Sequence, residues 1–244
     1  MRKTVLFVLL GLFAISMVQQ AQAQNDDRLS KWLVGINGGV NFSKTNPNDT
    51  ININYSSRNK TGFHLNGIAA YDLHPNVTLN MGLGLQTHGY RVYCDTKATA
   101  NKIARSIVDI NMPIGLSFRQ GSGGARFFHE KIGMNLHYSF IGNNDTFKNT
   151  PTNTVYRVAE SDVKKFYPTF FVGIGMGNNN AKGDRFEFGL TYHYNPGNVL
   201  NLQVQGGEFY RKAFPLTYRG GMLQATFTYY FNTGNLKKSE EYFY

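Results

Sequence analysis

Cysteine is almost absent from this chain. Cys94 is the only one among 244 residues, so no disulfide can form within the chain. A secreted soluble domain of this size could have used several. Cys94 lies in a predicted loop, VYCDTK, and is interpreted as a bystander thiol, with an intermolecular link as the alternative. The chain therefore lacks the signature of a disulfide-stabilised domain.

Long hydrophobic runs are missing after the N-terminus. Residues 1–23 have the order of a secretory signal peptide: the charged start MRK, the apolar run TVLFVLLGLFAIS and the small-residue site AQA. Cleavage there would leave Gln24 first, with residues 24–31 as a short periplasmic segment. A transmembrane anchor is the alternative, but the run is short and a cleavage site follows it. Beyond it no apolar run reaches the roughly 18–20 residues of a membrane helix.

Negative charge is scarce. The chain has 25 Lys and Arg against 15 Asp and Glu, and removal of Arg2 and Lys3 lowers the formal charge from +10 to +8. Such a balance can indicate a nucleic-acid partner. Here the charges fall mainly in predicted loops and turns, and export argues against nucleic acid. Acidic surface lipids or glycans fit better as neighbours.

Motifs for metals and cofactors are also lacking. The six histidines are scattered, without the compact spacing of metal ligands. The glycine-rich stretches VGIGMG and NMGLGL alternate within predicted strands and precede no helix, so they are not phosphate loops. We therefore expect neither a metal nor a cofactor.

What the chain does contain is a two-residue period. In FHEKIGMNLHYSFIG, residues 128–142, the even positions after Glu130 are apolar up to Phe140, and the odd positions are polar or small up to Ser139. This alternation predicts eight strands, at 32–43, 61–72, 77–90, 104–119, 128–142, 166–177, 185–194 and 220–231. They are longer than the usual five or six residues of a globular strand, and about 9–11 residues suffice for a tilted strand to cross a bilayer.

Short and long connections alternate between these strands. The short ones are LHPN, QGSGGARF and NNNAKGD, whereas the others span about 44–60, 91–102, 143–164 and 196–219. Outer-membrane barrels have short periplasmic turns and long extracellular loops. The fourth long loop contains another alternating piece, VLNLQV, which is expected to extend the barrel as a hairpin or to pair with a partner.

The apolar faces could contact either a protein core or lipid. A secreted β-sandwich would also alternate, but here the apolar faces carry almost no charge, and aromatic residues gather at both strand ends. At the short-turn end the predicted lipid-interface aromatics include Trp32, Tyr71, Phe118, Phe186 and Phe231. Because every backbone donor in lipid must be paired, the sheet has to close. We predict an all-β fold: a closed up-and-down antiparallel transmembrane β-barrel of eight strands over 32–231, followed by a periplasmic tail, 232–244.

Several stretches resemble the eight-stranded outer-membrane β-barrel family of Bacteroidetes, sometimes called PorT-like. These are WLVGINGGVNFS, DINMPIGLSFRQ and FFHEKIGMNLHYSF. The resemblance implies the barrel fold and the outer membrane of a Gram-negative bacterium. One member of that family is a component of type IX secretion, so this role enters as an option. Its members are otherwise diverse, and no functional residues carry over.

The polar faces predict a network in the lumen. An eight-stranded barrel is narrow enough for side chains to fill it, and opposite charges there should pair. A turn between Arg119 and Phe127 sets Asp109 opposite His137, and a slip by two residues would change the partners. The predicted network comprises Asp109, His137, Lys131, Glu187, Arg185, Arg119 and His129. It is either a structural plug or a gated proton or ion path.

These features favour a protein that is not an enzyme. His137 and Ser139 share a face near Asp109, as in lipid A-modifying barrels, but both should face the lumen, away from acyl chains. We expect a structural or accessory subunit of an envelope complex in secretion, assembly or adhesion, in contact with outer-membrane lipid and lipopolysaccharide. A narrow channel is the alternative, and a lipid A-modifying enzyme comes third. The aromatic end of the tail, EYFY, could anchor a partner.

Overall fold

The computed structural model describes residues 32–43, 56–58, 60–93, 102–121, 125–140, 145–149, 155–180, 183–206 and 214–232. The predicted signal peptide, the segment 24–31, the thiol Cys94 and the tail from residue 233 lie outside these ranges. Among the described residues, no helix has the length and hydropathy needed to cross a membrane.

All eight predicted strands are present, each within a few residues of its expected bounds. They are β1 (Trp32–Ser43), β3 (Lys60–His74), β4 (Val77–Tyr93), β5 (Lys102–Gln120), β6 (Arg126–Ser139), β9 (Phe166–Asn179), β10 (Arg185–Tyr194) and β13 (Met222–Asn232). The largest difference is in β6, which begins two residues and ends three residues before its predicted bounds, and β4 and β5 continue as a ribbon that pairs out to Tyr93 and Lys102.

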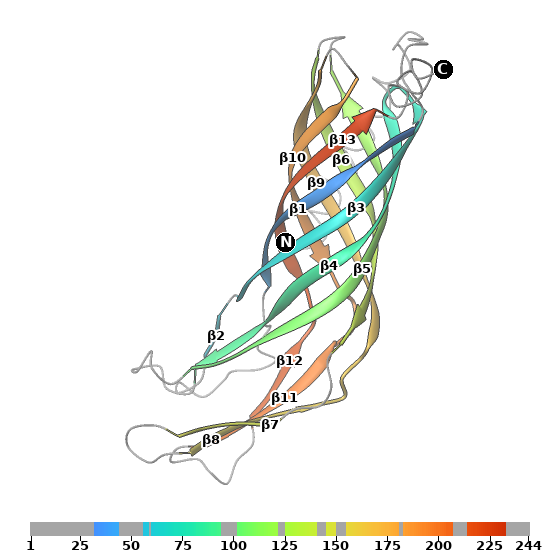
Figure 1. The fold of residues 1–244 in the computed structure, drawn as a ribbon. Coiled ribbons are helices and arrows are strands. Elements are labelled where there is room, and N and C mark those ends of the chain that lie inside the picture. The colour runs from blue at the N-terminus through green and yellow to red at the C-terminus, as the bar shows by residue number, and fades with distance from the viewer. Residues whose placement is uncertain are drawn as a thin grey trace, which may run out of the picture.

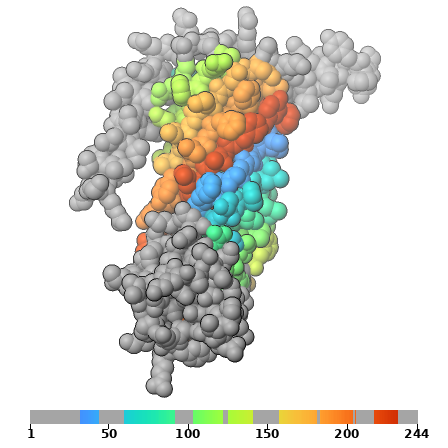
Figure 2. Space-filling model, turned by 90° about the vertical axis from the view of Figure 1, so that its left-hand side faces the viewer, coloured from blue at the N-terminus to red at the C-terminus, as the bar shows by residue number. Residues whose placement is uncertain are grey.

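The eight strands close into an antiparallel barrel. Each pairs with its neighbours in sequence, β1 pairs with β13, and the pairing of β4 with β5 completes the ring. Figure 1 shows the strands tilted around a common axis, and Figure 2 shows β13, β1 and β3 as parallel diagonal bands on one face. Closure satisfies the backbone groups of every strand, as hydrocarbon demands.

Apolar side chains cover the outside of the barrel. Leu65, Leu83 and Ile174, in the middle of their strands, are 65%, 61% and 67% exposed. The polar residues that alternate with them are buried inside. A soluble monomer rarely exposes a continuous apolar band of this kind, so the exposure pattern favours lipid over a protein core.

A second sheet lies beyond the barrel at the end with the long connections, called here the loop end; the opposite end is the turn end. Its strand order is β12 (Phe214–Tyr218), β11 (Leu200–Gly206), β8 (Val155–Ser161) and β7 (Asp145–Asn149). The predicted hairpin at VLNLQV is confirmed as β11–β12, and β11 also pairs with β8. A short strand, β2 (Ser56–Arg58), pairs antiparallel with the end of β4. The long connections are thus partly folded.

The second sheet contributes to a hydrophobic core at the mouth of the barrel. Leu200, Leu202 and Tyr218 of this sheet are fully buried together with Tyr90 of β4 and Tyr167 of β9. A deep apolar cluster at this place keeps water from the barrel mouth. The core therefore covers the loop end of the lumen.

The register between β5 and β6 differs from the prediction by two residues. Asp109 lies opposite Ser139 rather than His137, and Asn111 lies opposite His137 rather than Asn135. The cause is the turn: β5 continues to Gln120, so the connection is centred one residue later than predicted. Because the shift is even, every side chain keeps its face.

Glycines on the inner face make room for aromatic rings. A Cβ added to Gly133 would lie 2.6 Å from Phe171 Cζ, and one added to Gly115 would lie 2.7 Å from the same atom. Phe171 thus fills the lumen above two strands that have no side chain there. Ile68 and Ala70, which break the alternation of β3, pack inward with Leu33 and Tyr230.

Candidate functional site

Two layers of polar side chains cross the lumen. The turn-end layer consists of Asp72, Arg119, His129, Lys131, Arg185 and Glu187. The loop-end layer consists of His88, Asp109, His137, Tyr167, Thr169 and Tyr218. Between them lies a small chamber. These three parts together form the candidate functional site.

Asp72 is the centre of the turn-end layer. Its two carboxylate oxygens each receive one guanidinium, Arg119 Nη2 at 2.9 Å from Oδ1 and Arg185 Nη2 at 2.9 Å from Oδ2. Thr78 Oγ1 donates to Oδ1 at 2.6 Å. These side chains come from β3, β5, β10 and β4, so the bonds span the lumen. Burial of such charges is tolerated only because they are paired.

A second ion pair completes the turn-end layer. Lys131 Nζ of β6 lies 2.7 Å from Glu187 Oε2 of β10, and both side chains are largely buried. The buried His129 side chain, also on β6, lies beside Gly175 of β9. The charged residues of this layer therefore hold β6 and β10 together.

The loop-end layer is built around one carboxylate oxygen. Asp109 Oδ2 lies 2.7 Å from His88 Nε2 and 3.4 Å from His137 Nδ1, and it accepts a hydrogen bond from the Tyr167 hydroxyl. His88 Nδ1 lies 2.6 Å from the Tyr218 hydroxyl of β12. Burial raises the pKa of Tyr218, so its hydroxyl stays protonated and can donate to His88. This bond ties the second sheet to the barrel.

The hydrogen bonds continue from this layer toward the middle of the barrel. His137 Nε2 lies 3.0 Å from Thr169 Oγ1, which lies 3.4 Å from His193 Nδ1. His193 lines the chamber. A row of polar groups thus connects the covered mouth with the centre of the lumen.

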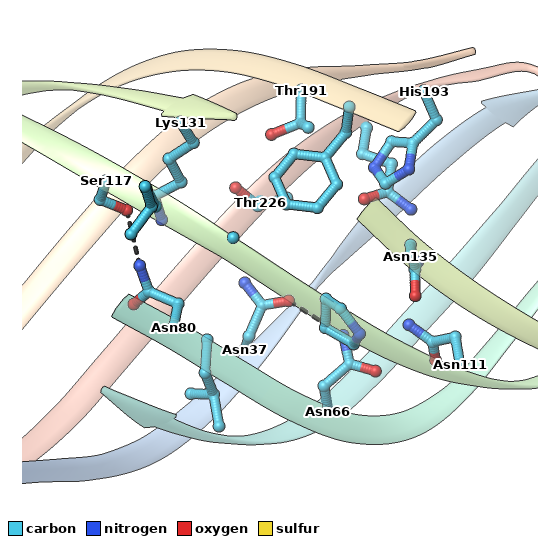
Figure 3. A pocket seen from close by; sticks show the side chains of 16 residues that line it. Asn37, Asn66, Asn80, Asn111, Ser117, Lys131, Asn135, Thr191, His193 and Thr226 are labelled. Atoms are coloured by element: carbon cyan, nitrogen blue, oxygen red, sulfur yellow. Dashed lines mark hydrogen bonds between the residues drawn. The ribbon is translucent and has the colours of Figure 1, made fainter. Parts of the chain in front are cut away.

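The chamber is a cavity of about 70 Å³ that several amide and hydroxyl side chains line, although most of its wall area is apolar. Figure 3 shows asparagines from several strands around it, with Asn37 bonded to Asn66 and Asn80 bonded to Ser117. Phe171, Ile68 and Leu116 form its apolar part. The volume is enough for a few water-sized molecules and too small for a solute to diffuse through.

The structure places all seven predicted network residues inside the barrel, but in two groups. Asp109 and His137 are in the loop-end layer, in contact despite the shifted register. The other five are in the turn-end layer. Sequence reasoning missed the central carboxylate, Asp72, although its place on a polar face beside a short turn was a usable signal. No sequence signal pointed to Tyr218, because it lies in a long connection that was predicted as a loop.

The predicted interface aromatics differ in exposure. Trp32, Phe186 and Phe231 are exposed, and Tyr71 is half-buried with its ring centroid 4.7 Å from that of Trp32. Phe118 does not stand free at the surface, since it is 6% exposed. It lies between Val77 and Glu130 in the register, which is consistent with side chains of neighbouring strands covering its ring.

The residues considered for catalysis are enclosed. His137 is bonded to Thr169 rather than Ser139, and Ser139 Oγ has no hydrogen-bond partner among the described residues. Asp109, His137 and Ser139 are at most 1% exposed. Lipid acyl chains on the outside of the barrel cannot reach them in this arrangement. Within the described ranges, no group of three or more His, Cys, Asp and Glu is placed to hold a metal ion.

Several solved structures are similar to this chain, among them two outer membrane proteins. The crystal structure of the outer membrane protein OprG from Pseudomonas aeruginosa matches with a TM-score of 0.50 and 10% identity, over 84% of this chain and 97% of that one. The solid-state NMR structure of the outer membrane protein AlkL in DMPC bilayers matches with a TM-score of 0.44 and 13% identity, over 86% and 94%. No curated protein matches significantly. Likeness at this identity concerns the fold alone.

A family model covers most of the chain. The model of the outer membrane protein beta-barrel domain matches residues 20–201. This range includes seven of the eight barrel strands, β1 to β10 without the loop strands, and β13 closes the ring after it. The outward apolar band, the closed sheet and the family match agree on location and fold: the chain is an outer-membrane protein and belongs to the family of the outer membrane protein beta-barrel domain.

Proposed function

We propose that this barrel is a non-enzymatic structural or accessory subunit of an envelope complex. The observation that carries the proposal is that side chains block the lumen. The turn-end layer and the loop-end layer, each joined by ion pairs or hydrogen bonds, lie on either side of the chamber. Since outer-membrane barrels have their short turns in the periplasm, the turn-end layer faces the periplasm and the second sheet faces outward. In a barrel filled in this way, partner proteins can bind to the outer surfaces, but solutes have no open path through the lumen.

The folded loop end is the surface most suited to a partner. Its four-stranded sheet is held to the barrel by a buried core and by the bond of Tyr218 to His88. Pre-folded surfaces cost less entropy on binding than loose loops. Secretion, including type IX secretion, assembly and adhesion are the roles that this proposal covers, and kinship with PorT-like barrels is part of it. Outer-membrane lipid and lipopolysaccharide are the neighbours expected along the barrel wall.

Purification tests the proposed subunit role. Cells that express the full chain with an affinity tag are treated with a short cross-linker, and the outer membrane is extracted with mild detergent. We expect a stoichiometric companion, with cross-links on residues of β7, β8, β11 or β12. Recovery of the barrel alone from cross-linked native membranes would contradict the proposal.

A narrow channel is the second candidate, because the chamber lies inside the barrel and a row of hydrogen bonds across β6, β9 and β10 leads to it. Planar-bilayer recording of the purified chain separates the two functions. The closed lumen predicts no conductance steps above those of protein-free detergent. Reproducible steps whose number grows with added protein would instead favour the channel.

A further inference from the structure

We propose that the chamber in the middle of the barrel binds one monovalent cation, such as Na⁺ or K⁺, as a structural ligand. This site goes beyond the proposed function, which assigns no ligand. It is derived from the buried polar atoms that line the chamber, which we call the amide site: Asn66, Asn111 and Asn135.

Each residue of the amide site has a carbonyl oxygen that needs a donor or a cation. Asn66, Asn111 and Asn135 are 4%, 2% and 1% exposed and line the chamber. Their Oδ1 atoms have no hydrogen-bond partner among the described residues. The amide of Asn66 is oriented by its own bond, because Nδ2 donates to Asn37 Oδ1 at 3.1 Å. Buried oxygens without partners are costly, so three around one cavity indicate an occupant.

The strand register places these three asparagines on one part of the lumen wall. Asn66 of β3 lies opposite Gly84 of β4, and Gly84 lies opposite Asn111 of β5. Asn66 Oδ1 lies over Gly84, where a Cβ would be 2.3 Å from it, so the absence of a side chain at Gly84 leaves room for this oxygen on the side of β5. Asn135 of β6 lies opposite Pro113, two positions along β5 from Asn111 on the same face. The three amides thus come from three strands and line the same side of the chamber, as Figure 3 shows.

The donor set favours a monovalent cation over a divalent one. Ca²⁺ and Mg²⁺ take carboxylates, whereas the amide site offers neutral oxygens, of the kind that replace the hydration shell of K⁺ in selectivity filters. A chamber of about 70 Å³ accommodates an ion together with a few waters. Hydroxyl oxygens of Thr191 and Thr226 on the chamber wall can hold such waters.

The surrounding charges are compatible with this ion. Lys131 also lines the chamber, but its ammonium is paired with Glu187 at 2.7 Å. On the other side, Asp109 is fully buried two positions from Asn111, and its Oδ1 has no partner within the described part of the chain. Asp109 is bonded through Oδ2 to His88 and Tyr167 and does not line the chamber, so neither charged neighbour occupies the amide site. His193 on the wall adds no charge while it is neutral.

Thermal unfolding in different salts tests the proposal. The full chain in detergent is measured at one ionic strength in NaCl, KCl, RbCl or N-methylglucamine chloride, whose cation is too large for the chamber. We expect one or more small cations to raise the Tm by about 2–4 °C over N-methylglucamine, with saturation. Asn111→Leu and Asn135→Leu should lose this difference.

Asn80→Leu is the matched control. Asn80 lines the same chamber, but its Oδ1 accepts from the Tyr230 hydroxyl at 2.8 Å and its Nδ2 donates to Ser117 Oγ at 2.8 Å. Asn80→Leu should keep the Tm difference between small cations and N-methylglucamine, even if its Tm is lower in every salt. If the variants do not fold, anomalous diffraction from wild-type crystals soaked in RbCl still decides. A peak within reach of the three oxygens supports the site; waters only, or equal Tm values in all four salts, overturn it.

Discussion

At the scale of single residues, the interior is organised by pairs of an aromatic ring and a glycine. Phe171 covers Gly115 and Gly133, and Phe127 covers Gly177. The alternation places these glycines inside, since they occupy the polar or small side of their strands. It did not assign Phe171 or Phe127 to the inside, because an inward aromatic interrupts the two-residue period. Which ring meets which glycine depends on register, which composition does not encode.

These pairs make a sharp prediction for Gly133→Ala. The added Cβ would lie 2.6 Å from both Phe171 Cζ and Gly115 Cα, and one of these neighbours is backbone. Overpacking of this kind costs about 1–3 kcal/mol. Gly67→Ala is the control, since its Cβ would meet only Leu83 O, at 3.8 Å. Urea unfolding in lipid vesicles should show a loss for Gly133→Ala and little change for Gly67→Ala; equal losses would refute the interior packing.

The charged residues show where sequence reasoning ends. The facing of these charged side chains was predicted, because it follows from the alternation alone. Partners were not, because a shift of two residues preserves every face and exchanges every pair. Asp109 still contacts His137 at 3.4 Å, but diagonally. Asp72 binds two arginines that lie far from it in sequence, and only the closed ring brings the three together.

At the scale of elements, the strands that cross the membrane were predictable and the folded loops were less so. Period-two alternation sustained over a whole strand locates it to within a few residues. The extra strands β7 and β8 lie in a polar connection without such a signal. Only VLNLQV, with its alternating leucines and valine, indicated structure beyond the barrel. Its second partner, β8, could not be foreseen because that pairing joins two different connections.

The second sheet should open when its core is weakened. Leu202 of β11 is fully buried in that core, whereas its neighbour Gln203 is exposed. Leu202→Ala should cost about 2–5 kcal/mol locally, and Gln203→Ala almost nothing. Protease added to intact cells should then cleave Leu202→Ala faster within residues 199–218, while the barrel keeps its heat-dependent mobility on gels. Equal cleavage of both variants would show that the core does not hold the sheet.

At the scale of the whole molecule, contact of the apolar strand faces with lipid hydrocarbon accounts for the closed sheet, the narrow polar lumen and the pairing of its charges. If hydrocarbon contacts the apolar face of each strand, the sheet must close, the polar faces must share a narrow lumen, and buried charges must pair. The structure shows each of these. The same alternation in a sandwich would have left two open sheets with polar outer faces. Closure therefore connects the pattern of single residues with the location of the protein.

Contact with lipid predicts that the cost of an arginine on the outer face of β10 depends on its depth in the bilayer. Leu190 lies at the middle of the outward face of β10, and Phe186 lies on the same face near the turn end. An arginine at the bilayer midplane costs about 2–4 kcal/mol, and one near an interface about 0–1 kcal/mol. Leu190→Arg should therefore destabilise the barrel in lipid vesicles much more than Phe186→Arg, as measured by urea unfolding. In a soluble sandwich with this face in its core, both would be strongly destabilising, and with this face in water, neither would be. A clear difference between the two variants is expected only if the face crosses a bilayer.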